Sequence, residues 1–308
     1  MEPQGVTRFF RRLLAATCAV VLGTPLAWGW TSSSSAFGVT IRVEGEGWGR
    51  AEREEIETLL YAVADELVDG PAPVFAHAIV VTQGGDAPVA LFERGPAGEH
   101  RIRLSARDRA WAQYAYQFGH ELCHIMANHG VHAHDSARRR HQWFEEALCE
   151  AAGLYVLRSM AVRWRDQAPT PAWEDYAPIL GDYAARLAGE AHRRLAAGQT
   201  PADWLRTRIH ALGDDPYRRD DNEVLANLLL AHFEQTPEHW AALYALNRRD
   251  SAPVRDFGDH LRQWHDAAPV AHRPFIAALA ALLVRTEADV AVKPPAQLAA
   301  SVAAARAN

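Results

Sequence analysis

The apolar residues of this 308-residue chain change their spacing partway along it, and that change limits the folds available to it. Before residue 168 the sequence contains four short strand-like segments, at 39–43, 78–82, 89–93 and 100–104. Helical spacing in the same half predicts helices at 50–68, at 108–128 and from Gln142 onward. After Ala168 all periodic segments are helical: 175–194, 202–212, 221–234, 237–247, 253–266 and 273–287. We therefore predict an α+β fold, in which a small mixed sheet and its helices precede an all-helical part.

The first 29 residues are predicted to be an export signal that is removed from the folded protein. Arg8, Arg11 and Arg12 precede an apolar run, 13–28, which is shorter than the roughly 20 residues that cross a bilayer as a helix. An uncleaved N-terminal membrane anchor is the alternative. After the signal (1–29) we place a linker, an α/β part, a helical part and an Ala-rich tail, at 30–37, 38–166, 167–292 and 293–308.

Composition excludes several classes of protein. An apolar fraction of 49% is too high for a disordered chain. The 32 basic and 38 acidic residues give a net charge of -6, which provides no general attraction for nucleic acid. Three cysteines are too few for a small domain held together by disulfides.

The residues best suited to chemistry lie at 120–124, which read His-Glu-Leu-Cys-His. On a helix, residues four apart share one face with their Cβ atoms about 6 Å apart, so His120 and His124 can bind one tetrahedral zinc ion. Glu121 lies roughly 60° around the helix from His124, within reach of a water molecule on that ion. The motif falls inside a predicted helix and follows an alternating strand.

A second segment provides carboxylates on the next predicted helix and reads Trp143-Phe144-Glu145-Glu146-Ala147-Leu148-Cys149-Glu150. Together the two segments resemble the gluzincin metallopeptidases, the superfamily of thermolysin-like and M1-like zinc peptidases. The resemblance covers about residues 100–155 and implies a zincin-like catalytic part with Glu146 as the third zinc ligand, Glu145 being the competing ligand. It also implies that Glu150 accepts the second N–H of a zinc-bound histidine, the alternative being a solvent-facing glutamate.

The resemblance implies hydrolysis of peptide bonds without a covalent intermediate. Zinc lowers the pKa of a bound water molecule to about 7 and polarises the scissile carbonyl. Glu121 would take the proton of that water as general base and pass it to the leaving amine. A further donor should stabilise the oxyanion, and Tyr217 is our candidate, with His210 and His232 as alternatives.

Two features beside the motif have open interpretations. The strand at 100–104 is a candidate substrate platform, because an exposed strand edge can pair with an extended peptide; otherwise Arg101 and Arg103 only protect an edge from aggregation. The loop after the motif is rich in histidine, and we expect a polar rim of the site rather than a second metal there. These histidines are His129, His132, His134 and His141.

Cys123 and Cys149 lie beside the proposed ligands His124 and Glu146, whereas Cys18 would leave with the signal. Helices that share a zinc ion must pack closely, so the two thiols could form a disulfide in an oxidising compartment. The alternatives are two buried apolar side chains or, less favoured, ligation of zinc by a thiol.

From the sequence we expect an exported zinc peptidase, periplasmic or secreted, that binds one zinc ion and acts on a peptide or protein. Endopeptidase activity is slightly favoured because the Gly-x-Met-Glu-Asn motif of M1-like aminopeptidases is absent. No nucleic acid and, after signal cleavage, no membrane is expected as a partner. The alternatives are a non-catalytic zinc-binding module of the cell envelope and a helical scaffold protein.

Overall fold

The computed structural model describes residues 38–284 except 69, 71, 133–137 and 249–253. The predicted signal, linker and Ala-rich tail, together with His134, lie outside the described residues. Within the described part of the chain, no helix combines the length and the apolar character needed to cross a membrane.

Four short strands form one mixed sheet in the order β1-β2-β4-β3. They are β1 (Ile41–Glu44), β2 (Ile79–Gln83), β3 (Val89–Leu91) and β4 (His100–Leu104). The first three strands in this order run parallel, and β3 is antiparallel to β4, with Ala90 opposite Ile102. Side chains alternate between buried and exposed along β1 and β4, because only one face of the sheet is covered.

The strand order corrects one prediction. We expected the strand at 100–104 to offer a free edge to substrate, but β4 is hydrogen-bonded to a neighbour on both sides. The edge strand beside the motif is β3, so Arg101 and Arg103 of β4 project from the exposed face of the sheet. A substrate that adds to this sheet on the motif side would therefore pair with β3.

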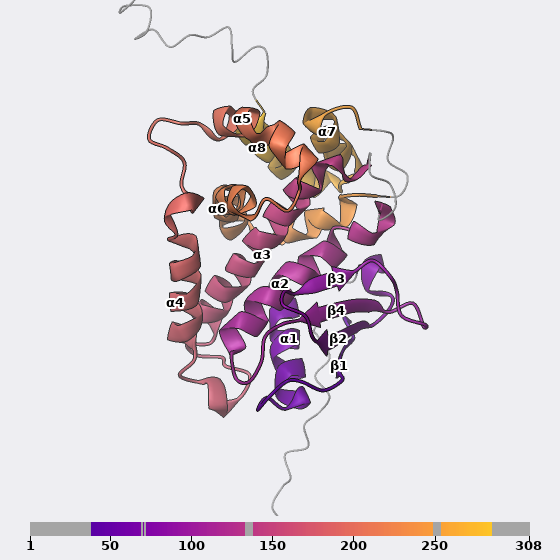
Figure 1. Ribbon diagram of the computed structural model, residues 1–308, viewed down its shortest axis with the longest axis vertical. Helices are drawn as coiled ribbons and strands as arrows, with labels where there is room; N and C mark the ends of the chain where they lie inside the picture. The colour runs from indigo at the N-terminus through magenta and orange to yellow at the C-terminus, as the bar shows by residue number, and fades with distance from the viewer. Residues whose placement is uncertain (1–37, 69, 71, 133–137, 249–253, 285–308) are drawn as a thin grey trace, which may run out of the picture. The chain divides into compact units, whose positions relative to one another are not determined.

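Three helices connect the sheet to the rest of the protein. Helix α1 (Arg53–Leu67), which begins with a capping box between Glu52 and Glu55, and helix α2 (Trp111–Met126) pack beside the sheet. Helix α3 (Gln142–Arg163) runs along α2, as Figure 1 shows. Its residues are buried on almost all sides, as is typical of a central helix, because α1, α2, α4 and α6 surround it.

Two glycines allow α2 and α3 to approach closely. A Cβ atom at Gly153 would lie 2.9 Å from the ring of Tyr116 and 3.0 Å from its carbonyl oxygen. A Cβ atom at Gly119, next to His120, would lie 3.0 Å from Val156. A Cβ atom at Gly153 would therefore force Tyr116 to shift, and one at Gly119 would be tight against Val156, so the absence of side chains favours this helix contact.

Short helices form the remainder of the described chain: α4 (Ala177–Ala188), α5 (Pro201–Asp214), α6 (Arg219–Gln235), α7 (Phe257–Ala267) and α8 (Arg273–Leu283). The side chains of Thr200 and Asp256 cap the N-termini of α5 and α7. The helix predicted at 237–247 is instead a 3₁₀ helix, η6 (Pro237–Ala245). The fold is therefore helix-rich with a small mixed sheet, in agreement with the predicted α+β class.

Candidate metal centre

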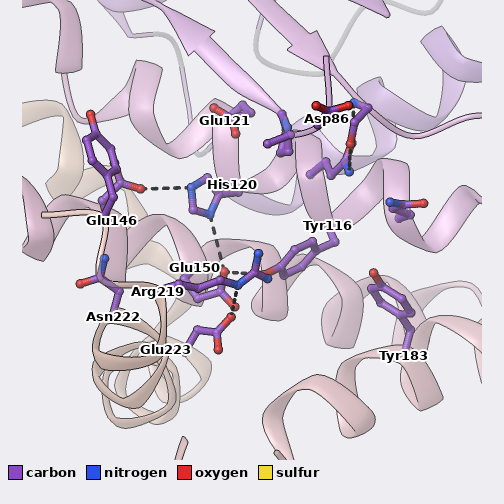
Figure 2. Close-up of a pocket in the computed structure, with 16 residues that line it drawn as sticks. Asp86, Tyr116, His120, Glu121, Glu146, Glu150, Tyr183, Arg219, Asn222 and Glu223 are labelled. Carbon is purple, nitrogen blue, oxygen red and sulfur yellow. Dashed lines mark hydrogen bonds and ion pairs between the residues drawn. The ribbon is translucent and has the colours of Figure 1, made fainter. Parts of the chain in front are cut away.

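Three side chains from two helices converge on one point. His120 and His124 project from one face of α2, and Glu146 faces them from the first turns of α3. The two Nε2 atoms are 3.2 Å apart, and each lies 3.5 Å from Oε2 of Glu146. Figure 2 shows His120 between Glu146 and Glu150.

The spacing of these atoms fits a bound metal ion. Ligand atoms held at 2.0–2.1 Å from a tetrahedral zinc ion lie about 3.3 Å from one another. The observed separations of 3.2 and 3.5 Å match that value. Two imidazoles and one carboxylate also form the kind of ligand set that catalytic zinc sites use, with a fourth position left for water.

The charges around the cluster also favour a cation. Burial alone would lower the pKa of His120, but its contacts with Glu146 and Glu150 raise that pKa to about 10. Although Glu146 is buried, the neighbouring histidines hold its pKa well below the usual range. An environment that stabilises protonated histidines to this extent could also hold a metal cation, for which protons would compete.

The carboxylate of Glu145 and the side-chain amide of Asn247 lie on the Nδ1 side of His124. Nδ1 of His124 donates a hydrogen bond to Oε1 of Glu145 over 2.6 Å, and Nδ2 of Asn247 donates to the other oxygen over 2.6 Å. Because Nδ1 carries the proton, the Nε2 lone pair of His124 is directed at the cluster. Glu145, our competing ligand, thus orients a histidine, while Glu146 provides the third donor atom.

Glu150, four residues after Glu146, lies on the Nδ1 side of His120. Its Oε2 lies 3.7 Å from Nδ1 of His120 and also accepts a hydrogen bond from the hydroxyl of Tyr116. Burial raises the pKa of this carboxyl, but His120, Arg193 and Tyr116 outweigh burial and lower it to about 2. Glu150 is therefore an anion that faces the Nδ1 side of His120 at ion-pair distance.

Glu121 is buried beside the edge strand. Its Oε2 accepts a hydrogen bond from the backbone N–H of Ala90 in β3 over 2.6 Å. Burial raises the pKa of Glu121 above its usual value, although the two histidines oppose this. A carboxylate with a raised pKa is a stronger base, which suits the predicted role in proton transfer.

Two pockets meet at the cluster, and both are lined by His120, Glu121, Glu146, Pro88 and Tyr217. The larger pocket, of about 520 Å³, extends past Tyr116 and Tyr183. The smaller pocket, of about 250 Å³, follows β3 to Phe92 and His129. The cluster therefore lies on a groove that continues to both sides of it.

Tyr217, our candidate oxyanion donor, lies at the cluster. It lines both pockets, its side chain is largely exposed, and its hydroxyl accepts a hydrogen bond from Gln142 over 2.9 Å. The alternatives His210 and His232 line neither pocket. Among the three candidates the geometry favours Tyr217.

Of the alternatives for Cys123 and Cys149, the structure shows no disulfide between them. Both residues are free, fully buried cysteines in the contact between α2 and α3. Burial, together with a hydrogen bond to Cys123, raises the pKa of the Cys149 thiol. The two thiols therefore pack as small apolar side chains and are not among the clustered metal donors.

Asn247 and Arg193 were not expected from the sequence to contribute to the site, whereas His129 was expected only as part of its polar rim. Asn247 and the buried Arg193 lie far from the motif in the chain, and no local spacing marks either of them. His129 stacks on Phe92 and lines the smaller pocket, and burial lowers its pKa to about 3. A cluster of histidines in the sequence indicated this loop but not which of its members is buried.

Comparison with known proteins found no matching family model, no matching curated protein and no matching solved structure.

Proposed function

We propose that this protein is an exported zinc-dependent peptidase whose metal ligands are His120, His124 and Glu146. The main support is the spacing of the three donor atoms, which matches the edges of a zinc coordination tetrahedron. The buried Glu121 at the same point supports hydrolysis, because a purely structural zinc site needs no general base. Export rests on the sequence of residues 1–29 alone.

Each residue of the site would have a separate role in hydrolysis. A bound zinc ion would act as a Lewis acid and activate a water molecule. Glu121 accepts the proton of the water and passes it to the leaving amine. The hydroxyl of Tyr217, which lines both pockets, would donate a hydrogen bond to the developing oxyanion. The edge strand β3, whose Ala90 N–H is bound by Glu121, lines the smaller pocket, in which an extended peptide would lie beside the cluster.

The groove favours an endopeptidase over an aminopeptidase. The larger pocket is lined by α2 residues that precede the motif, such as Gln113 and Tyr116. The smaller pocket is lined by residues at and after its end, His124 and His129. An endopeptidase needs room for the chain on both sides of the scissile bond, and these two pockets provide it.

Metal content and cleavage together test this proposal. The purified protein should contain about one zinc ion, which the double variant His120→Ala, His124→Ala should lose. The variant Glu121→Gln should retain zinc but lose at least ~100-fold of the cleavage rate of casein or a peptide library, because the general base is gone.

The outcomes distinguish a zinc peptidase from a non-catalytic zinc-binding module. Equal cleavage by the wild type and by Glu121→Gln would falsify the mechanism. Zinc binding without cleavage of any substrate would instead support a non-catalytic zinc-binding module. If the wild type contains no zinc after loading with the metal, neither the zinc peptidase nor the zinc-binding module is supported.

A further inference from the structure

Arg193 has the environment of a residue that organises a site rather than a surface charge. It lies in the short 3₁₀ helix η5 (Ala191–Arg193) between α4 and α5, and its side chain is 0% exposed. The next residue, Arg194, is exposed. A fully buried guanidinium is costly unless carboxylates compensate its charge, so its partners decide what it does.

Two buried glutamates hold Arg193 in place. Its NH2 group lies 2.8 Å from Oε1 of Glu150 and 2.9 Å from Oε1 of Glu223 in α6, and its Nε donates to Glu190. The side chains of Glu150 and Glu223 are 8% and 4% exposed. Arg193 thus joins α3 to α6 through one buried ionic contact.

The same contact fixes the orientation of Glu150. Arg193 binds Oε1 of Glu150, which leaves Oε2 for the Tyr116 hydroxyl and for Nδ1 of His120. Without the guanidinium, Oε1 would lose its ion-pair partner at 2.8 Å, and the carboxylate would turn toward Arg219, whose charge also acts on it. That rotation would displace the anionic oxygen that faces Nδ1 of His120 at 3.7 Å, and with it the ring orientation that directs Nε2 at the cluster.

We propose that Arg193 is a positioning residue of the metal centre, which holds Glu150 behind His120 and ties it to Glu223 on the wall of the larger pocket. The inference rests on the proposed metal site but not on peptidase activity. It makes η5, where the sequence shows only a pair of adjacent arginines, a determinant of metal affinity. Acting through Glu150, Arg193 itself touches neither metal nor substrate.

A matched control exists elsewhere in α3. Arg163 pairs with Glu66 over 3.0 Å, and the Glu66 side chain is 2% exposed. The variants Arg193→Met and Arg163→Met each remove a guanidinium from a buried glutamate. Both should lower the melting temperature, but only Arg193→Met should affect the metal centre.

The test measures the Kd for zinc of metal-free protein by competition with a chelator and the visible spectrum of the cobalt-substituted protein, both without substrate. Arg193→Met should raise the Kd by about 10- to 100-fold, the usual effect of losing a residue that supports a ligand, and alter the cobalt spectrum. Arg193→Lys should recover part of the affinity, and Arg163→Met should leave Kd and spectrum unchanged.

A Kd for Arg193→Met within twofold of the wild type would overturn the proposal, as would an equal increase in Arg163→Met. If Arg193→Met does not fold, Arg193→Lys is measured in its place. An unchanged Kd for zinc and an unchanged cobalt spectrum in Arg193→Lys would then overturn the proposal. A wild type that binds one zinc ion but cleaves no peptide contradicts the peptidase and leaves this inference intact.

Discussion

Two adjacent glutamates at the start of α3 have different tasks, because a helix directs neighbouring side chains about 100° apart. Glu146 points at the two imidazoles and offers Oε2 to the same point as both Nε2 atoms. Glu145 points to the far side of His124, where it bridges Nδ1 and the side chain of Asn247. Asn247 adopts a left-handed backbone conformation (φ 52°) that asparagine tolerates better than most residues.

A single buried residue, His141, should make the free energy of unfolding depend on pH. Its ring is buried against Trp143, Phe257 and His260, and neither ring nitrogen has a hydrogen-bond partner among the described residues. Burial, aided by Arg140 and opposed by Asp256, lowers its pKa to about 4. Since the unfolded chain binds this proton more readily, its contribution is complete above about pH 6.5 and is lost as pH falls toward 4.

The variant His141→Phe keeps the ring contacts and removes the titration. Its free energy of unfolding, measured by urea denaturation without metal, should fall less steeply between pH 6.5 and 4 than that of the wild type. The difference in slope should reach at most ~1.4 kcal/mol per pH unit, the value for one proton. Parallel pH profiles of the two proteins would show that His141 is not buried as described.

At the scale of elements, the metal centre depends on how closely α2 and α3 pack. A Cβ atom at Gly153 would collide with Tyr116 of α2, and one at Gly119 would be tight against Val156 of α3. Tyr116, against which Gly153 packs, donates a hydrogen bond from its hydroxyl to Glu150. A change in the helix separation would therefore reach His120 through Tyr116 and Glu150.

The variant Gly153→Ala should lower the stability and also weaken zinc binding. The added methyl group meets the Tyr116 ring and backbone at 2.9–3.0 Å, and such overpacking costs about 1–3 kcal/mol. Gly181→Ala in α4 is the control, because its Cβ would meet Ala161 at an ordinary 3.6 Å. In denaturation experiments that control should be neutral or up to ~1 kcal/mol more stable. Equal stability of Gly153→Ala and the wild type would refute the close approach of the helices.

At the scale of the whole molecule, local patterns in the sequence predicted the elements but not their arrangement. The four strands and the helix bearing His120, Glu121 and His124 follow from spacing within a few residues. Sheet order depends on contacts between distant segments, so β4 was taken for an edge although β3 occupies that place.

The same limit applies to the candidate site. The residues that face the cluster lie in two adjacent helices and could be found by spacing. The residues that bind Glu145 and Glu150 from other parts of the fold lie far along the chain. Asn247 reaches Glu145 across 102 positions, and Arg193 differs from its exposed neighbour Arg194 only through tertiary packing. Parts of the molecule that sequence analysis could describe only as helical therefore contribute to the site.

Anomalous diffraction at the zinc edge, from crystals of the zinc-loaded protein, tests the central claim most directly. One peak is expected about 2.0–2.1 Å from Nε2 of His120, Nε2 of His124 and a carboxylate oxygen of Glu146, with Glu121 beside the remaining position. A zinc-replete protein without a peak at this point, or a peak bound by Glu145 or Cys149 instead of Glu146, would contradict the account.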